Sequence, residues 1–482
     1  MSDVRVEKSS PVQGWLGPKA WGRLEQRVQL ALRRARKHGS PVMTSVTSGV
    51  AEPVDPTAVI ARSRGAMTHW FCFEQPDRDG YAVAGLGRLH EFRARGDERF
   101  ARISRDWSAL SAGALQDPVQ APAGSGLIAV GGFAFDPEGG AGSEWAGFEP
   151  ASLVVPEVSL ARGPEGSTIT VNSSVAPDDT VDDVLRRAAS QMAGLRRGPL
   201  PMLDPAPVGS YRVHSPMPPA HYEQAVRSGV DRIRAGDVQK VVLAREVEVG
   251  APTAYDPAAI LGLLRQEFPS CYVFALGRGD ATFLAASPEL LVRREGQRAS
   301  TVALAGSIGR SADPAVDDHL GERLLRSAKD REENAIVARN IAGVLRPRAV
   351  WITAAPEPAV IKVANIQHLA TPIRAQLASP VPVIELTGAL HPTPAVGGEP
   401  RARAAELIPA LEGLDRGWYA GTVGWTDSTG DGEFSVALRC ALLRGSVARL
   451  YAGCGIVRDS DPASELAETE IKLAALLPAL TG

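Results

Sequence analysis

Tyr451-Ala-Gly-Cys-Gly-Ile-Val457 leads through Ser460-Asp-Pro462 into Glu465-Leu-Ala-Glu468-Thr-Glu-Ile-Lys472. The two glycines let the backbone approach a ligand closely, and Ser460 with Pro462 marks the start of a helix. The spacing i, i+3, i+7 places two carboxylates and an ammonium on one helix face. Because the rest of the segment is apolar, this face is expected to meet something other than solvent or the core. A hard cation such as Mg²⁺, with the lysine on an anionic ligand, would fit.

A second acidic pair lies earlier in the chain, in Lys329-Asp-Arg-Glu-Glu-Asn334. Asp330 and Glu333 are again spaced i, i+3. One such pair is usually a solvated helix face with local ion pairs. Two pairs on two facing helices could supply the carboxylate oxygens that Mg²⁺ prefers, with waters and a substrate oxygen completing an octahedron.

Polar residues within apolar strands are further candidates. Lys240 opens Lys240-Val-Val-Leu-Ala-Arg245, where a lysine usually guards an edge or snorkels to solvent; burial would instead favour the neutral amine, a usable general base. Glu289 is either a turn carboxylate or an acid kept protonated by apolar neighbours. Arg439 needs an anion, either a substrate carboxylate or a protein carboxylate. Tyr419 is a strand-associated polar group, and His368 has the setting of a satisfied core histidine.

Composition narrows the function classes. The 482 residues carry a net charge of −3, which offers no electrostatic footprint for nucleic acid or an anionic membrane. The sequence contains neither an apolar run long enough to span a bilayer nor the apolar core of a signal peptide, so a cytoplasmic location is expected. The four cysteines have no ligand-like spacing and are expected to be reduced thiols.

The pattern along the chain predicts four regions: a basic helical extension at 1–40, a sheet-rich half at 41–200, a proline-rich connector at 201–219, and a region of alternating strands and helices at 220–482. Strand pairs joined by short glycine turns imply antiparallel neighbours, which favours an α+β fold over a Rossmann sheet. In the last region, helices are predicted at 220–235, 256–267, 316–345, 402–412 and 462–479, and strands at 240–245, 272–277, 282–286, 289–294, 421–426, 433–439 and 448–457.

Eight short motifs follow one another in residues 220 to 482: Lys240-Val-Val-Leu-Ala-Arg245, Ser287-Pro-Glu-Leu290, Leu304-Ala-Gly-Ser307, Lys329-Asp-Arg-Glu-Glu-Asn334, Gln367-His-Leu369, His391-Pro-Thr-Pro-Ala395, Gly417-Trp-Tyr-Ala-Gly421, and Gly453-Cys-Gly-Ile-Val457 with Glu465 to Lys472. In this order they resemble the chorismate-utilising enzymes, which include isochorismate, salicylate and anthranilate synthases. Gly131-Gly-Phe-Ala-Phe-Asp136 in the first half is similar to menaquinone-type isochorismate synthases. The resemblance implies one large α+β fold with two big antiparallel sheets and helices outside, and makes 220–482 the chorismate-binding catalytic region.

The resemblance also implies roles for single residues. Lys240 matches a general base that activates water, and Glu289 a general acid that protonates the departing hydroxyl. Glu333 and Glu468 match Mg²⁺ ligands, with Asp330 and Glu465 acting through water. The groups that would bind or line the substrate are Tyr419, Arg439, the backbone N–H of Gly453, Lys472, His368, Ala305, Gly306 and Ser307.

Family differences favour an Mg²⁺-dependent isochorismate synthase. Ser307 and Ala395 stand where threonine is usual in salicylate-type members, and Ala303 and Asn334 also resemble menaquinone-type members. The alternatives are a salicylate synthase, an aminodeoxyisochorismate- or anthranilate-type synthase, and a chorismate-binding pseudoenzyme. Chorismate is the implied partner; the pathway (menaquinone or siderophore) and the oligomeric state, monomer or homo-oligomer, stay open.

Overall fold

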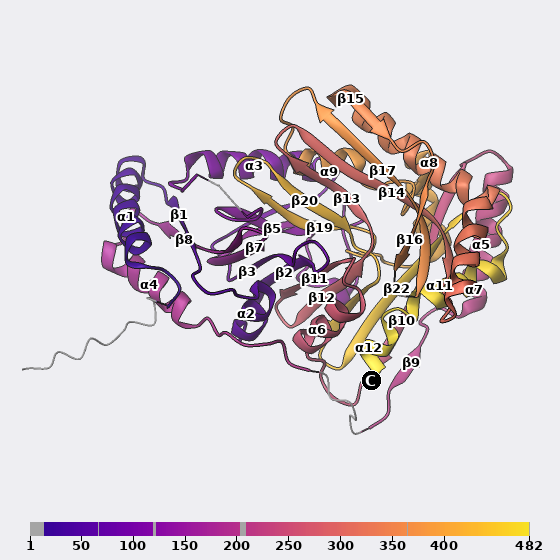
Figure 1. Ribbon diagram of the computed structural model, residues 1–482, viewed down its shortest axis with the longest axis horizontal. Helices are drawn as coiled ribbons and strands as arrows, with labels where there is room; N and C mark the ends of the chain where they lie inside the picture. Colours follow the sequence, from indigo (N-terminus) through magenta and orange to yellow (C-terminus); the bar gives the residue numbers. More distant parts are fainter. Residues whose placement is uncertain (1–13, 66, 119–121, 203–208, 364, 482) are drawn as a thin grey trace, which may run out of the picture.

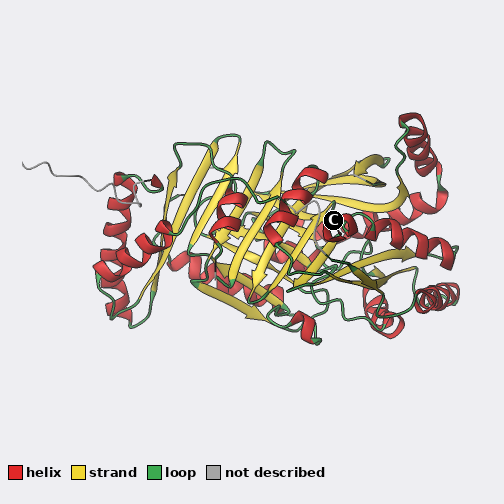
Figure 2. Cartoon of the chain, turned by 90° about the horizontal axis from the view of Figure 1, so that it is seen from below, coloured by secondary structure: helices red, strands yellow, loops and turns green. Residues whose placement is uncertain are grey.

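The fold is described from a computed structural model, which describes residues 14–65, 67–118, 122–202, 209–363 and 365–481. Two large antiparallel sheets form the centre of the molecule, and helices lie around them (Figures 1 and 2). The predicted α+β fold is therefore confirmed. Within the described residues, no helix is long and apolar enough to cross a membrane.

The first sheet has twelve strands. Its order along the sheet is β1 (Val42–Gly49), β8 (Gly166–Val175), β7 (Val158–Gly163), β3 (Tyr81–Leu86), β2 (His69–Gln75), β11 (Tyr272–Arg278), β12 (Ala281–Ser287), β21 (Cys440–Arg444), β22 (Val447–Ile456), β10 (Lys240–Gly250) and β18 (Gly398–Glu399), and β9 (Arg212–His214) pairs with β10.

The second sheet has ten strands. Its order is β15 (Ala349–Ala354), β17 (Ile366–Leu377), β14 (Arg298–Gly309), β13 (Leu290–Glu295), β20 (Gly432–Val436), β19 (Thr422–Asp427), β5 (Ile128–Phe133), β6 (Ala151–Val155) and β4 (His90–Ala94), and β16 (Ala359–Val363) pairs with β17.

The helices lie outside the sheets in Figure 2. They are α1 (Pro18–His38), α2 (Pro56–Ser63), α3 (Arg99–Gly113), α4 (Val181–Ala193), α5 (Pro219–Arg234), α6 (Pro257–Glu267), α7 (Pro314–Arg326), α8 (Ala328–Leu345), α9 (Val383–Leu390), α10 (Arg401–Glu412), α11 (Pro462–Leu473) and α12 (Leu477–Thr481), with short 3₁₀ turns at Ser143–Trp145 and Arg346–Arg348.

The two halves of the chain share both sheets. Strands from 41–200 form one side of each sheet and strands from the second half form the other, and the two blocks meet where β2 pairs with β11 and where β5 pairs with β19. The predicted extension at 1–40 contains α1, while its residues 1–13, and residues 203–208 of the predicted connector, lie outside the described residues. The division into four regions stays a prediction.

Four predicted elements are wrong in extent. The strand predicted at 240–245 continues to Gly250 as β10. The helix predicted at 316–345 is two helices, because Ser327 has an extended backbone and its side chain caps α8 by accepting from the Asp330 N–H at 3.3 Å. The helix predicted at 462–479 is also two helices, because α11 ends at Leu473 and α12 begins at Leu477, with Pro478 in the first turn of α12. The strand predicted at 433–439 stops at Val436, where the chain leaves the second sheet for β21 in the first.

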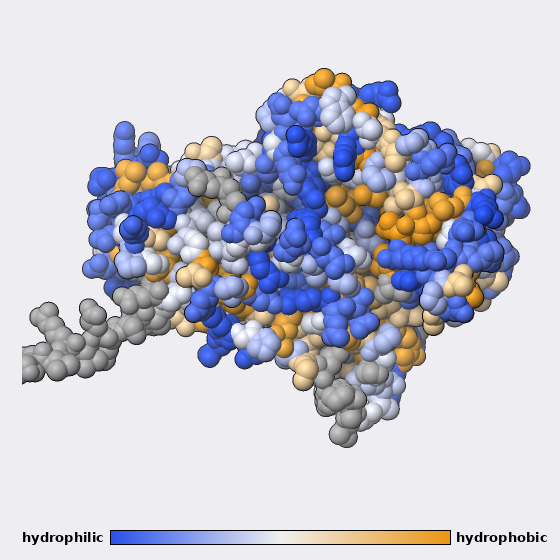
Figure 3. Space-filling model, viewed as in Figure 1, coloured by the Kyte–Doolittle hydropathy of each residue, from blue (hydrophilic) through white to orange (hydrophobic). Residues whose placement is uncertain are grey.

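The main hydrophobic core lies between the sheets and includes Phe283 of the first sheet and Phe434 of the second. A second core lies under α1, α2, α4 and α6, and a third under α5 and α10 against β10 and β22. Figure 3 shows a mostly hydrophilic face on which apolar residues gather near β15 and β16. Val350 and Trp351 of β15 are among the exposed large apolar side chains.

A buried ion pair joins α10 to β10. Arg416 Nε donates to Glu412 Oε2 at 3.0 Å, and both side chains are almost fully buried. The guanidinium also donates to the carbonyls of Val242 (2.9 Å) and Val396 (2.8 Å), while Glu412 Oε1 accepts from the Ala244 N–H at 2.7 Å. This pair therefore fixes β10 and the 391–396 loop relative to each other.

We expect Arg416→Met to lower the free energy of unfolding by roughly 3–5 kcal/mol, because the Glu412 carboxylate would stay buried without its partner. Urea denaturation followed by circular dichroism measures this. Arg403→Met is the matched control, since Arg403 pairs with Glu406 on the exposed face of the same helix and should cost no more than about 0.5 kcal/mol. A loss below about 1 kcal/mol for Arg416→Met would contradict the prediction.

Candidate active site

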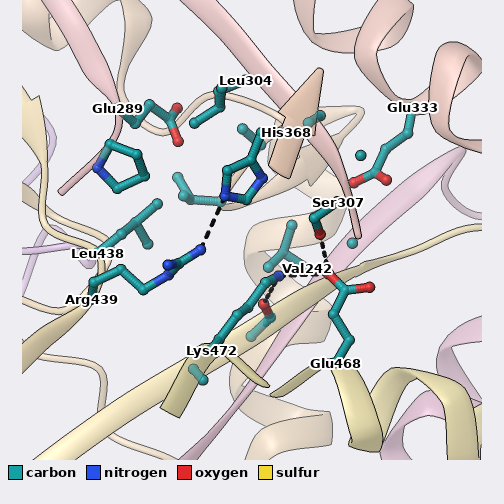
Figure 4. Close-up of a pocket in the computed structure, with 18 of the residues that line it drawn as sticks. Val242, Glu289, Leu304, Ser307, Glu333, His368, Leu438, Arg439, Glu468 and Lys472 are labelled. Carbon is teal, nitrogen blue, oxygen red and sulfur yellow. Dashed lines mark hydrogen bonds and ion pairs between the residues drawn. The ribbon is translucent and has the colours of Figure 1, made fainter. Parts of the chain in front are cut away.

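One cavity lies where the two sheets meet helices α8 and α11 (Figure 4). Its empty space is about 670 Å³ when the space open to solvent is counted. Eleven of the fourteen predicted site residues line it: Glu289, Ala305, Gly306, Ser307, Glu333, His368, Tyr419, Arg439, Gly453, Glu468 and Lys472. Lys240, Asp330 and Glu465 lie behind this lining.

Two features of the strands create room for charged groups. Strand β14 has a register shift between Ala305 and Ser307, where Gly306 has φ +79°. A Cβ at Gly306 would lie 2.9 Å from Asp330 Cβ, so only glycine lets α8 pack this closely. On β22, a Cβ at Gly455 would overlap the Glu333 carboxylate and approach Lys240 Nζ to 3.0 Å. These glycines bring the acidic face of α8 against both strands.

Glu289 lies in the link between β12 and β13, where its backbone N–H donates to Ser287 Oγ at 3.2 Å. The residue is 3% exposed. Burial raises the pKa of its carboxyl to about 8, and the positive charge of Lys240 only partly opposes this effect. Because the pKa lies above neutrality, the group carries a proton at pH 7 and can act as an acid.

Lys240 is fully buried, and its Nζ lies 2.8 Å from Glu333 Oε1. The contact lacks the geometry of a directed hydrogen bond, so the amine is held by charge. In the view of Figure 4, Glu289 and Glu333 lie on opposite sides of the cavity. The structure thus places a buried amine and a buried protonated carboxyl near one space from different sides.

Arg439 and His368 form one wall of the cavity. Arg439 Nη2 donates to His368 Nε2 at 3.0 Å (Figure 4), and Arg439 Nη1 is buried with no hydrogen-bond partner among the described residues. Burial and the nearby Arg439 and Lys472 lower the pKa of His368 to about 3, so the imidazole is neutral. Arg439 has φ +48° in the link that crosses from one sheet to the other. That strained backbone directs a guanidinium with a free donor toward the cavity.

The opposite wall comes from α11. Lys472 Nζ lies 2.8 Å from Glu468 Oε1 and donates to the Gly453 carbonyl at 2.7 Å, while Ser307 Oγ donates to Glu468 at 2.6 Å. Burial alone would raise the pKa of Glu468, but Lys472, Ser307 and Lys329 hold it at about 2.

The backbone N–H of Gly453 points away from β10. Gly453 lies opposite Ala244 of β10 in the antiparallel pairing, and the Ala244 N–H donates to Glu412 on the other side of the strand. Gly453 and Ala244 are therefore a non-hydrogen-bonded residue pair of the two strands.

The candidate metal ligands do not converge as one set. Among the described residues, the one group of potential ligands lying within 4.8 Å of one another is Cys454, Glu465 and Glu468. Glu333 instead faces Lys240, and Glu465 Oε1 accepts from Lys329 Nζ at 2.8 Å. The oxygen-rich donor set nevertheless fits a hard divalent cation, although lysines hold three of its carboxylates in this structure.

The sequence did not assign a site role to three residues that lie at the cavity or on the helix behind it. Tyr451 stacks on Tyr419 with ring centroids 5.2 Å apart and lines the cavity, although an aromatic residue in an apolar strand looks like a core residue. Lys329 opens the motif Lys329-Asp-Arg-Glu-Glu-Asn334, but its contact with Glu465 of α11 joins residues 136 apart in the chain and is not visible in the sequence. Asn334 Nδ2 donates to the carbonyls of Ala303 (3.1 Å) and Leu369 (3.0 Å), which ties α8 to β14 and β17.

Comparisons with known proteins agree with this geometry. The family described as chorismate binding enzyme matches residues 30–481. A salicylate biosynthesis isochorismate synthase of Pseudomonas aeruginosa is 37% identical over 94% of this chain and 93% of its own length. Isochorismate synthase MenF of Bacillus subtilis is 32% identical over 94% and 96%. The solved structure of the menaquinone-specific isochorismate synthase MenF from Escherichia coli has a TM-score of 0.77 at 27% identity, and covers 94% of this chain and 100% of that one.

Proposed function

Because the chain belongs to the chorismate-binding enzyme family, we propose that it is an isochorismate synthase that uses Mg²⁺. The observation that carries the proposal is the placement of Lys240 and Glu289, a buried amine and a buried protonated carboxyl beside one cavity. The relatives named as isochorismate synthases support it. Some are named for menaquinone and others for salicylate biosynthesis, so the proposal covers the reaction and leaves the pathway open.

The cavity offers groups suited to a small dianion. Arg439 has an unpartnered Nη1 and Gly453 an N–H that points away from its neighbouring strand, and the Tyr419 hydroxyl lies 2.9 Å from the position of a Gly453 Cβ. Together these donors could bind the enolpyruvyl carboxylate. Neutral His368 accepts a hydrogen bond from the Arg439 guanidinium and so fixes its orientation at the cavity wall.

The reaction replaces a ring hydroxyl at one carbon by water at another. Lys240, in its neutral form, would take the proton of the attacking water, and Glu289 would give its proton to the departing hydroxyl. Glu289 suits its task because burial keeps its carboxyl protonated, and Lys240 would act as the base in its neutral form. Product release would then require Lys240 to return its proton and Glu289 to regain one.

The carboxylates of α8 and α11 are the proposed Mg²⁺ ligands: Glu333 and Glu468 directly, with Asp330 and Glu465 acting through water. Bound Mg²⁺ would neutralise charge on the ring carboxylate of the substrate. Ser307 holds Glu468 in the orientation required to face the cavity. Asp330 is positioned by the N-terminal cap of its helix and by its contact with Gly306.

We expect purified protein with chorismate and Mg²⁺ to form isochorismate, resolved by chromatography, and to lose this activity with a chelator. Release of pyruvate with salicylate would favour a salicylate synthase. An aminated product in the presence of ammonia would favour an anthranilate- or aminodeoxyisochorismate-type enzyme. Tight chorismate binding without turnover would identify a pseudoenzyme.

Lys240→Ala is expected to abolish turnover while chorismate binding, measured by calorimetry, changes little, because the proposed base does not bind the substrate carboxylates. Loss of a general base costs typically ~10²–10⁴-fold in rate. Turnover close to that of the unsubstituted protein would remove the base assignment.

We expect the rate to fall as pH rises through about 8, because the pKa of Glu289 is raised to about 8 and the required form is the protonated one. Below that pH the acid is fully protonated, so Glu289 imposes no loss on the acid side. A pH profile of kcat between 6 and 10 tests this expectation. Glu289→Gln, which cannot give a proton, should be inactive at every pH, and residual activity with an unchanged alkaline limb would contradict the assignment.

A further inference from the structure

Each of three carboxylates at the proposed metal site is paired with a different lysine. The pairs are Glu333 with Lys240, Glu465 with Lys329, and Glu468 with Lys472, each at 2.8 Å. With Asp330, the site therefore carries four carboxylates and three ammonium groups. The lysines neutralise most of the charge that would attract a divalent cation.

Two of these lysines have tasks in the proposed reaction, but Lys329 has none. It lies in the first turn of α8 and does not line the cavity. Its side chain is 38% exposed, whereas the Glu465 carboxylate that it binds is only 2% exposed. The Lys329 ammonium therefore crosses from α8 to α11, between the two helices that carry the proposed ligands.

The Lys329 ammonium interacts electrostatically with carboxylates of both α8 and α11. Burial alone would lower the pKa of Lys329, but Glu465, Glu333 and Glu468 together raise it. In turn Lys329 opposes the rise in the pKa of Glu465 that burial causes, and it helps to lower the pKa of Glu468. One ammonium is thus within electrostatic range of carboxylates from both helices.

We propose that Lys329 is an internal cation that competes with the divalent metal for Glu465 and its neighbours, and so sets a low metal affinity in the absence of substrate. The inference rests on the proposed Mg²⁺ dependence. A metal ion and an ammonium that share one buried carboxylate repel each other, because both charges lie in a poorly screened environment. Metal binding then requires the Lys329 side chain to move outward, which its partly exposed position permits.

A positioning role for Lys329 makes the opposite prediction. If the ammonium only held Glu465 in a metal-binding orientation, its removal would free the carboxylate and weaken metal binding. Competition instead predicts tighter binding when the positive charge is removed. The direction of the change in affinity therefore distinguishes the two roles.

The test is a titration of the full-length protein with Mn²⁺, a spin-active substitute for Mg²⁺, with free Mn²⁺ measured by electron paramagnetic resonance and no substrate present. We expect Lys329→Gln to lower the dissociation constant for Mn²⁺ by about tenfold, an order-of-magnitude figure for one partly screened charge. Lys329→Arg, which keeps the charge, should bind Mn²⁺ as the unsubstituted protein does.

Lys362→Gln is the matched control. Lys362 is also 38% exposed and binds the buried Asp317, but that pair lies between α7 and β16. Its substitution should leave the Mn²⁺ affinity unchanged.

An unchanged or weaker affinity in Lys329→Gln overturns the inference while the metal site itself stands. If no variant binds Mn²⁺, both the inference and the proposed metal dependence fail. If Lys329→Gln binds more tightly but chorismate is not converted, the inference stands and the proposed reaction falls.

Discussion

The antiparallel pairing of β10 with β22 is the contact on which the rest of the site depends. It joins residues 241–250 to 447–456, two segments about 200 residues apart in the chain. The pairing places Lys240 of β10 beside Gly455 of β22, and α11 follows β22 directly. Without this register, the Lys240 amine of β10 and the acidic face of α11 would not lie near the same cavity. Register is strongly specified here, because a slip by one residue would turn every buried side chain to the wrong face.

Burial of charge is the second constraint. The cavity contains carboxylates, amines and a guanidinium in a largely dry setting, and an isolated charge there would be costly. Glu468 meets this constraint with Lys472 and Ser307, and Glu333 meets it with Lys240. Glu289 meets it differently: among the described residues it has no ion-pair partner, and burial raises the pKa of its carboxyl so that it holds a proton instead. The same constraint thus produces ion pairs on one side of the cavity and a neutral acid on the other.

Much of the site could be predicted from sequence because local spacing encodes it. The i, i+3, i+7 spacing predicted that Glu465, Glu468 and Lys472 share one face of α11; Glu468 and Lys472 line the cavity, whereas Glu465 lies behind its lining. The partners could not be predicted in this way. Lys329 and Glu465 are 136 residues apart, and no periodicity indicates which lysine meets which carboxylate. The predicted strand through Arg439 was too long because the apolar pattern continues beyond Val436, whereas the left-handed backbone of Arg439 depends on the crossing between sheets.

The lysine pairs also explain how a site built for a cation can be stable without one. Two of the four carboxylates, Asp330 and Glu465, lie in the first turns of their helices, where the helix dipole favours them, but the four carboxylates repel one another. Ammonium groups relieve that repulsion during folding, when no bound metal is guaranteed. The same groups oppose metal binding afterwards, so the stability of the free protein and its affinity for a cation are antagonistic properties of one cluster. Lys240 and Lys472 are buried, whereas the Lys329 side chain reaches solvent. Of the three lysines, Lys329 can therefore move away from its carboxylate at the lowest cost in free energy. The opposition between the stability of the free protein and its affinity for a cation thus depends mainly on Lys329.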